Sequence, residues 1–327
     1  MLTYVIKRIG VAIPLIWLGL TLTFFIMRLA PGDPTTQYIN PEFDPEVKQL
    51  MMEKFGLDKP LHIQYWKWLT SFVQGDFGTS FDRSRPVADV IHDAIYNTLL
   101  LNGLALIISL LTGVVLGIFS AIKQYSRFDD VMTVTSLFFY SMPSFWLGLM
   151  LILIFSYLLG WLPTGGMLSV NYEYMSAWGQ FWDRVVHLIM PVFVLGLATA
   201  ASTMRYMRGS MLEIIRQDYI RTARAKGVSE RKVNFKHATR NAILPVVTLF
   251  GLSIPFIFSG SIITEIVFAW PGMGRVMLTA IFARDYPVAI AVVGIIYIMV
   301  TMGNLIADIM YAAVDPRVRY GSGGGSE

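Results

Sequence analysis

The chain has 327 residues, of which 55% are hydrophobic and only 15% are charged. A soluble domain of average composition carries about 25% charged residues. The composition therefore excludes an ordinary water-soluble enzyme, a disordered chain and a nucleic-acid-binding tail. The chain has no cysteine, which excludes disulfides, thiolate metal sites and cysteine nucleophiles. The net charge of +4 is small, so the placement of the charges is more informative than their sum.

Six apolar stretches are long enough to cross a membrane, since a bilayer core of about 30 Å needs about 20 helical residues. They cover residues 9–29, 99–121, 131–159, 185–204, 241–268 and 288–311. The third and fifth are the longest, so we expect them to tilt or kink, at Pro143 and Pro255 respectively. The sequence predicts an all-α membrane protein with six transmembrane helices.

Basic residues gather in one segment between the fourth and fifth stretches. Residues 205–240, here called the basic loop, carry ten Lys and Arg residues. Short loops rich in Lys and Arg stay on the cytoplasmic side of a membrane. We therefore expect the basic loop and both termini to be cytoplasmic, and residues 31–97 to be extracytoplasmic.

The extracytoplasmic insert contains residues that typically begin and end helices, and its composition is not that of a flexible linker. Proline and glycine positions predict one helix over 44–56 and a second between Pro60 and Gly75. A third, beginning at Pro86, has an apolar face and is expected to lie on the membrane surface or on the second span. We favour a lid resting on the spans over an independent domain.

These patterns divide the chain into consecutive segments. The segments are 1–30 (N-terminus and first span), 31–97 (insert), 98–312 (five-helix core, including the basic loop), 313–320 (cytoplasmic C-terminus) and 321–327 (a Gly/Ser stretch resembling an artificial linker).

Signatures of catalysis are missing. No Gly-Lys pair occurs anywhere, so the chain has no P-loop of its own. The four histidines are scattered and form no His-Glu-x-x-His motif, and no Ser/His/Asp grouping is suggested by spacing. We expect no enzyme activity, no metal and no cofactor in this chain.

The basic loop reads as helix, break, helix. Apolar residues within 214–223 follow helical spacing, and Gly227 can end that helix in a left-handed conformation. Ser229 can cap the next helix, with Glu230 in its first turn. A passive loop facing lipid headgroups would also be basic, but it would not need residues that end one helix and begin the next.

The loop also carries a family resemblance. Residues 218–227 (DYIRTARAKG) and 237–248 (HATRNAILPVVT) resemble the cytoplasmic signature of permease subunits of ATP-binding-cassette importers, in the peptide/nickel branch. Further matching motifs are 30–34 (APGDP), 75–80 (GDFGTS), 141–143 (SMP), 264–274 (TEIVFAWPGMG), 285–287 (DYP) and 315–317 (DPR). The matches span residues 1–319, and the opening motif with the insert resembles the B-type subunit of a two-permease pair.

The resemblance implies a type I importer fold in which the basic loop holds a coupling helix that docks in an ATPase. The implied coupling residues are Arg221, Thr222, Ala223, Gly227, Val228, Ser229, Glu230 and Arg231. The general family triplet is Glu-Ala-Ala, but here it aligns with residues 221–223 (Arg-Thr-Ala). A role for its acidic residue therefore does not carry over.

The resemblance also implies partners: a second, similar permease, two ATPase subunits that bind ATP and Mg²⁺, an extracytoplasmic binding protein and membrane lipid, with no nucleic acid. The implied location is a bacterial or archaeal cytoplasmic membrane. Dipeptides, longer peptides and nickel chelates remain open as cargo, although the few histidines and the lack of cysteine argue against a metal path.

Polar groups within the apolar stretches are functional candidates because charge is unfavourable in a bilayer. Glu265 is the candidate for a gate or a substrate contact; Arg28 and Asp308 are expected to sit at interfaces with local partners. Four asparagines are expected to bridge helices by hydrogen bonds: Asn97, Asn102, Asn241 and Asn304. A small-residue stripe, Gly113, Gly117 and Ala121, predicts close helix packing.

Two other classes of protein remain as alternatives. An ion-driven secondary transporter predicts inverted repeats and paired broken spans with acidic residues near mid-membrane, which the sequence does not display. A membrane-embedded enzyme would need a catalytic grouping.

Overall fold

The computed structural model describes residues 2–29 and 58–314, and this part of the chain is helical apart from turns and one isolated β-bridge between Thr79 and Pro86. In chain order the helices are α1 (Leu2–Leu29), α3 (Leu61–Val73), α4 (Val87–Ile122), α5 (Arg127–Ser141), α6 (Ser144–Leu151), η2 (Ile152–Leu158), η3 (Tyr172–Tyr174), α7 (Ala177–Ile215), α8 (Asp218–Ala225), α9 (Glu230–Lys232), η4 (Val233–Ala238), α10 (Thr239–Ala242), α11 (Leu244–Ser259), α12 (Ile262–Val267), α13 (Met273–Phe282) and α14 (Tyr286–Val314).

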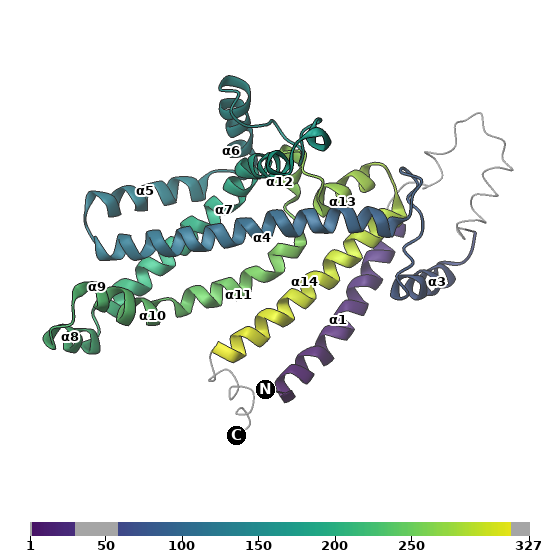
Figure 1. Ribbon diagram of the computed structural model, residues 1–327. Coiled ribbons are helices and arrows are strands. Elements are labelled where there is room, and N and C mark those ends of the chain that lie inside the picture. Colours follow the sequence, from purple (N-terminus) through teal and green to yellow (C-terminus); the bar gives the residue numbers. More distant parts are fainter. Residues whose placement is uncertain (1, 30–57, 315–327) are drawn as a thin grey trace.

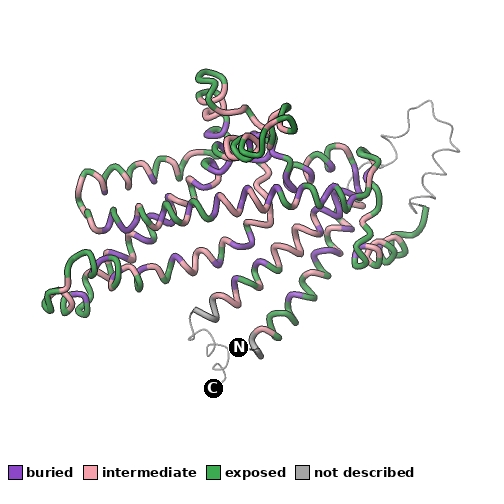
Figure 2. Tube along the Cα trace, viewed as in Figure 1, coloured by how far each residue is buried: buried purple, intermediate pink, exposed green. Residues whose placement is uncertain are grey.

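Within residues 2–29 and 58–314, four helices are individually long and apolar enough to cross a membrane: α1, α4, α7 and α14. Two bent pairs bring the number to six, namely α5 with the α6–η2 segment, and the α9–α10 segment with α11. The six predicted spans therefore correspond to four single helices and two bent pairs. Figure 2 shows buried and exposed positions alternating along the long helices, and many exposed side chains are large and apolar, as in a surface that faces lipid.

The third span breaks at Pro143 rather than kinking there. α5 ends at Ser141, Met142 is extended, and Pro143 precedes the first residue of α6. The two parts meet at 103°, so α6 stands away from α5 (Figure 1). A residue before proline disfavours the helical region, which explains a break at Met142 instead of a smooth bend.

The fifth span departs from its prediction. Pro255 was the expected kink site, but α11 runs through it to Ser259. The span is interrupted at Gly260, whose φ of 75° lies in the left-handed region that favours glycine. A second bend of 44° lies near Ile243, where α10 meets α11.

The helix predicted to start at Pro86 is not separate from the second span. α4 is a single 36-residue helix that runs through the 97/98 boundary proposed between insert and core. No glycine or proline occurs between residues 87 and 102 to interrupt it. The side chains of Asn97 and Thr98 bind other segments (below) instead of ending the helix.

A close helix contact joins α4 and α7 along the predicted small-residue stripe. A Cβ atom added at Gly113 would lie 2.7 Å from the Ala200 carbonyl oxygen, and one added at Gly117 would lie 2.7 Å from that of Met204. The prediction of close packing is confirmed, because only glycine permits this backbone approach.

The described part of the insert packs on the spans. Tyr65 and Trp68 of α3 lie with ring centroids 5.5 and 5.2 Å from Phe24 of α1, and the Tyr65 hydroxyl lies 2.7 Å from Thr21 Oγ1. α3 begins after Pro60, and Gly75 has a φ of 80°, as predicted. The helix expected over 44–56 lies outside the described residues.

The start of α1 and the end of α14 lie at the same end of the molecule (Figure 1). Arg8 of α1 forms a 2.9 Å ion pair there with Asp308 of α14. The expectation of a local partner for Asp308 is confirmed. At the other end of α1, the Arg28 guanidinium lies 5.8 Å from the centre of the Phe24 ring.

Candidate functional site

The basic loop begins later than predicted, because α7 continues to Ile215. The helix expected through 214–223 is interrupted, and α8 starts anew at Asp218. α8 then ends at a tight turn in which Gly227 has a φ of 78°. The Gly227 and Val228 amides donate to the carbonyls of Arg224 and Ala223, at 2.9 and 3.2 Å. This is the Schellman arrangement of a glycine-terminated helix, so the prediction for Gly227 is confirmed.

Glu230 lies in the first turn of α9, as predicted, but Ser229 does not act as expected. Ser229 occupies the position before α9, but its side chain makes no capping hydrogen bond. Glu230 instead accepts two hydrogen bonds from the Arg224 guanidinium, at 2.9 and 3.3 Å. This fork joins the two sides of the Gly227 turn, although both side chains remain partly exposed and the stabilisation is correspondingly small.

A group of buried apolar residues, here called the inner cluster, fixes the loop to the spans. Its members are Ile118, Ala121, Met207, Met211, Ile220, Val233, Ala238, Ala242 and Val246. They come from α4, α7, α8, η4, α10 and α11. Ile220 and Val233 are fully buried, so both arms of the loop are anchored. Neither residue could be singled out from the sequence, because α8 has only eight residues and is too short to show a clear apolar repeat.

The predicted coupling residues divide into two groups. Ala223 and Val228 pack against the inner cluster. The remainder are exposed: Arg221, Thr222, Gly227, Ser229, Glu230 and Arg231. Figure 1 shows α8 and α9 projecting from one end of the helix assembly. The loop therefore presents a polar outer surface on an apolar base that is continuous with three long helices.

A buried ion pair lies beside the inner cluster. Both oxygens of Asp129 accept hydrogen bonds of 2.7 Å from the Arg208 guanidinium. Ser120 donates to the same carboxylate, as does the Tyr125 amide at 3.1 Å. The network joins α4, α5 and α7. Nothing in the sequence indicates this network, because 79 positions separate Asp129 from Arg208.

Glu265, the candidate gate residue, is fully buried in α12. Its carboxylate accepts hydrogen bonds from the Thr98 hydroxyl at 3.1 Å and the Arg275 amide at 2.8 Å. The Thr98 oxygen in turn accepts the Met273 amide at 2.7 Å. Glu265 thus holds the 268–275 turn against α4, and in this conformation it offers no surface to a substrate.

Asn97 reinforces the same junction, and two further asparagines bridge other elements. Asn97 donates to the Pro271 carbonyl at 3.0 Å, and its own carbonyl accepts the indole N–H of Trp270 at 3.0 Å. Asn102 donates to the Ile257 carbonyl at 3.1 Å, and Asn241 donates to the Tyr219 hydroxyl at 2.8 Å. The bridging role is confirmed for these three asparagines, whereas Asn304 is exposed on α14.

Two of the short motifs meet in space although about 200 residues separate them. Asp285 accepts hydrogen bonds from the Ser80 hydroxyl at 2.5 Å and from the amides of Phe81 and Asp82 at 3.1 and 3.2 Å. Ser80 and Asp285 are both 2% exposed. This carboxylate fixes the turn before α4 to the start of α14.

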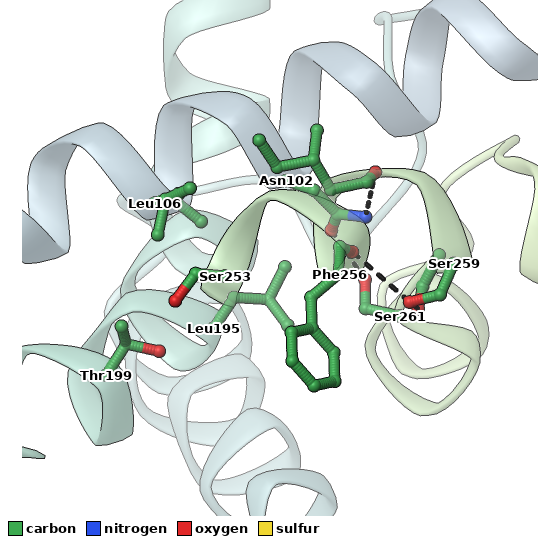
Figure 3. A pocket seen from close by; sticks show the side chains of 11 residues that line it. Asn102, Leu106, Leu195, Thr199, Ser253, Phe256, Ser259 and Ser261 are labelled. Carbon is green, nitrogen blue, oxygen red and sulfur yellow. Dashed lines mark hydrogen bonds between the residues drawn. The ribbon is translucent and has the colours of Figure 1, made fainter. Parts of the chain in front are cut away.

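A cavity of about 420 Å³ lies between α4, α7 and α11 (Figure 3). It is lined by Asn102, Ala105, Leu106, Leu195, Thr199, Ser253, Phe256, Ile257, Ser259, Gly260 and Ser261. The polar lining consists of hydroxyl groups and one amide, with no ionisable side chain. The Ser261 hydroxyl donates to the Asn102 side-chain oxygen at 3.2 Å. Such a wall can form hydrogen bonds with amides but offers no counter-ion.

Residues 2–29 and 58–314 contain no group of three or more His, Asp or Glu residues that could hold a metal ion.

The geometry defines a multi-pass membrane protein with a cavity between its long helices and an anchored loop at one end. Comparison with protein families gives the class a name. Residues 113–320 match the model of the binding-protein-dependent transport system inner membrane component, and residues 1–102 match that of the N-terminal part of the same membrane components.

Individual relatives extend the match over nearly the whole chain. The oligopeptide transport system permease protein AppB of Bacillus subtilis is 47% identical over 98% of this chain and 100% of its own length. The glutathione transport system permease proteins GsiC of Salmonella paratyphi A and Escherichia coli K12 are 41% and 40% identical, over the same shares of the two chains. The chain belongs to this family of ATP-binding-cassette importer permeases.

Proposed function

We propose that this chain is one permease subunit of an ATP-driven peptide importer. The observation that carries the proposal is the anchored loop: a polar surface built around Gly227 that stands on the inner cluster. The names of the relatives, which refer to oligopeptide and glutathione transport, support peptides as the cargo. The cavity lining favours the same class, since peptides present backbone amides to its hydroxyl and amide groups.

The partners follow from what the chain supplies. It carries half of a pathway, and a second, similar permease would supply the other half. Two cytoplasmic ATPases would bind ATP and Mg²⁺, because this sequence has no P-loop. An extracytoplasmic binding protein would deliver the peptide. The chain would lie in a bacterial or archaeal cytoplasmic membrane with both termini in the cytoplasm, in keeping with the basic loop.

The mechanism uses the loop as a rigid connection. When the ATPases close, they would displace the exposed residues around Gly227. The inner cluster would pass that displacement to α4, α7 and α11, because buried apolar packing transmits strain instead of absorbing it. The same three helices line the cavity. Its access would therefore alternate between the two sides of the membrane as the permeases rock against each other.

Of the two alternative functions, the ion-driven secondary transporter is the one that the structure can address. The sequence displayed no paired broken spans, yet the structure has two bent pairs. The residues at the breaks are Met142, Pro143, Ile243 and Gly260, none of them acidic, and a proton- or sodium-coupled site at a broken span would need such a residue. The bent pairs therefore do not favour this rival.

Transport measurements on purified components test the proposal. The permease pair, the ATPases and the peptide-loaded binding protein, reconstituted in vesicles with Mg-ATP, should accumulate peptide. Substituting a non-hydrolysable ATP analogue should abolish accumulation. Accumulation that follows an imposed proton or sodium gradient without ATP would refute the proposal in favour of the rival.

A further inference from the structure

A second cavity of about 370 Å³ opens near the extracytoplasmic end of α4. It is bounded by the turn before α4, the first turns of α4 itself, and α13. Its charged lining residues are Arg83, Arg85, Asp93 and Arg275. The two cavities have no lining residue in common, so this groove is separate from the proposed transport cavity.

The groove is strongly basic, with three guanidinium groups and one carboxylate. Asp93 pairs with Arg85 at 2.6 Å, which leaves two formal positive charges uncompensated among the lining residues. Arg83 and Arg275 are both exposed. The Nε atom of Arg85 is buried and has no hydrogen-bond partner in the described structure. These features match the needs of carboxylate ligands, which guanidinium groups bind through paired N–H donors.

The groove is held in a fixed shape. Asp285 binds the Ser80 side chain and the Phe81 and Asp82 amides on one side, and the Ser80 amide donates to the Arg85 carbonyl at 2.9 Å. On the other side, the Glu265 carboxylate accepts the Arg275 amide, and the Arg275 guanidinium donates to the Ala269 carbonyl at 2.5 Å. A preorganised site loses less conformational entropy on binding than a flexible one.

We propose that this groove binds carboxylate side chains on the surface of the extracytoplasmic binding protein when that protein docks. The inference rests on the proposed function. Both walls of the groove come from segments expected on the extracytoplasmic side. These are residues 31–97 and residues 269–287, which connect the fifth and sixth spans on the side opposite the basic loop. A carboxylate of the cargo is disfavoured because the groove does not share the lining of the transport cavity. Charge complementarity of this kind steers association and fixes the docked orientation.

Binding measurements on the intact complex test the inference. The assembled permease–ATPase complex is placed in nanodiscs of neutral phosphatidylcholine. The probe is the purified, peptide-loaded binding protein encoded beside the permease, and its affinity is measured by biolayer interferometry at low and high salt. The double variant Arg83→Glu/Arg275→Glu should bind roughly tenfold more weakly, mainly through slower association, and should lose most of the salt dependence.

Matched variants distinguish the loss of the groove charges from misfolding. Arg83→Gln removes one charge without reversing it and should give a smaller loss in the same direction. The double variant Lys67→Glu/Arg184→Glu makes the same change in net charge at exposed positions outside the groove and should bind nearly as the wild type does. Each variant is used only if the complex remains assembled in size-exclusion chromatography.

The outcomes separate this inference from the proposed function. Wild-type affinity in the groove variants, or an equal loss in the Lys67/Arg184 control, would overturn the groove as the docking site while leaving importer function intact. In a second set of nanodiscs that contain phosphatidylglycerol, a loss of binding-protein affinity seen only there would assign the groove to lipid and also overturn the inference. A binding protein with no affinity for the wild-type complex would instead contradict the proposed function.

Discussion

The Arg208 guanidinium of α7 donates two hydrogen bonds of 2.7 Å to the Asp129 carboxylate of α5, although 79 positions separate the two residues. Ser120 and Tyr125 add further donors to the same carboxylate. The pair ties the α4–α5 turn to α7 close to the point where α7 enters the basic loop. The ion pair therefore connects the base of the basic loop rigidly to α4, α5 and α7.

Asp129→Asn should destabilise the permease by about 2 kcal/mol or more, because it leaves the Arg208 guanidinium without its buried counter-ion. The value is below that for a fully buried pair, since the Arg208 side chain is 25% exposed. Thermal unfolding of the purified complex measures the change. The neighbouring Asp130→Asn is the matched control, because Asp130 is exposed. Equal melting temperatures for the two variants would contradict this role.

Gly227→Val should uncouple ATP hydrolysis from transport while leaving the protein in the membrane. A Cβ at Gly227 meets no atom within 4 Å, so the penalty comes from the φ of 78° alone, about 1–2 kcal/mol for a non-glycine residue. Asn tolerates that conformation better, so Gly227→Asn should retain more uptake. Gly209→Ala, in a helix with equally open space, is the control. Normal peptide-stimulated ATPase activity in the Val variant's complex would refute the prediction.

Gly117→Val should separate α4 from α7, since the new Cβ would lie 2.7 Å from the Met204 carbonyl oxygen and 2.7 Å from the Met207 Cβ. Overpacking of this kind destabilises by about 1–3 kcal/mol. Gly103→Val lies on the same helix but meets no atom within 4 Å, so it should be nearly neutral. Melting temperatures of both variants, measured in one detergent, distinguish a specific packing effect from a general loss of glycine.

Thr98→Val should loosen the turn over residues 268–275. The substitution keeps the shape of the side chain but removes the hydroxyl that joins Glu265 to the Met273 amide. Leaving buried polar groups unpaired costs about 1–3 kcal/mol. Thr112→Val is the control, because Thr112 is exposed and bonds only to carbonyls of its own helix. Limited proteolysis at the turn should accelerate in the Thr98 variant only; equal rates would exclude this role of the hydroxyl.

Local chemistry allowed several features to be predicted from the sequence. Apolar length located the spans, the left-handed turn at Gly227 followed from glycine's conformational freedom, and the 113–121 stripe followed from four-residue spacing. Asn97, Asn102 and Asn241 were assigned as bridges because polar amides in apolar helices need partners.

Long-range pairing could not be predicted in the same way. Nothing near Asp129 in the sequence indicates Arg208, and nothing near Ser80 indicates Asp285. The partners of Glu265 could not be predicted either, because sequence alone could not reveal that Thr98 and the backbone of α13 enclose it. The sequence also could not show that the fifth span breaks at Gly260 and not at Pro255. The tolerance of a helix for proline depends on its tertiary neighbours.

Under the proposed function, this chain does no work of its own and receives force through the loop around Gly227. The most direct measurement is uptake of radiolabelled peptide into vesicles that contain the chain alone, or the chain with its permease partner, ATPases, binding protein and Mg-ATP. The account predicts accumulation above the external concentration only in the complete system. Uphill accumulation by the chain alone would contradict it.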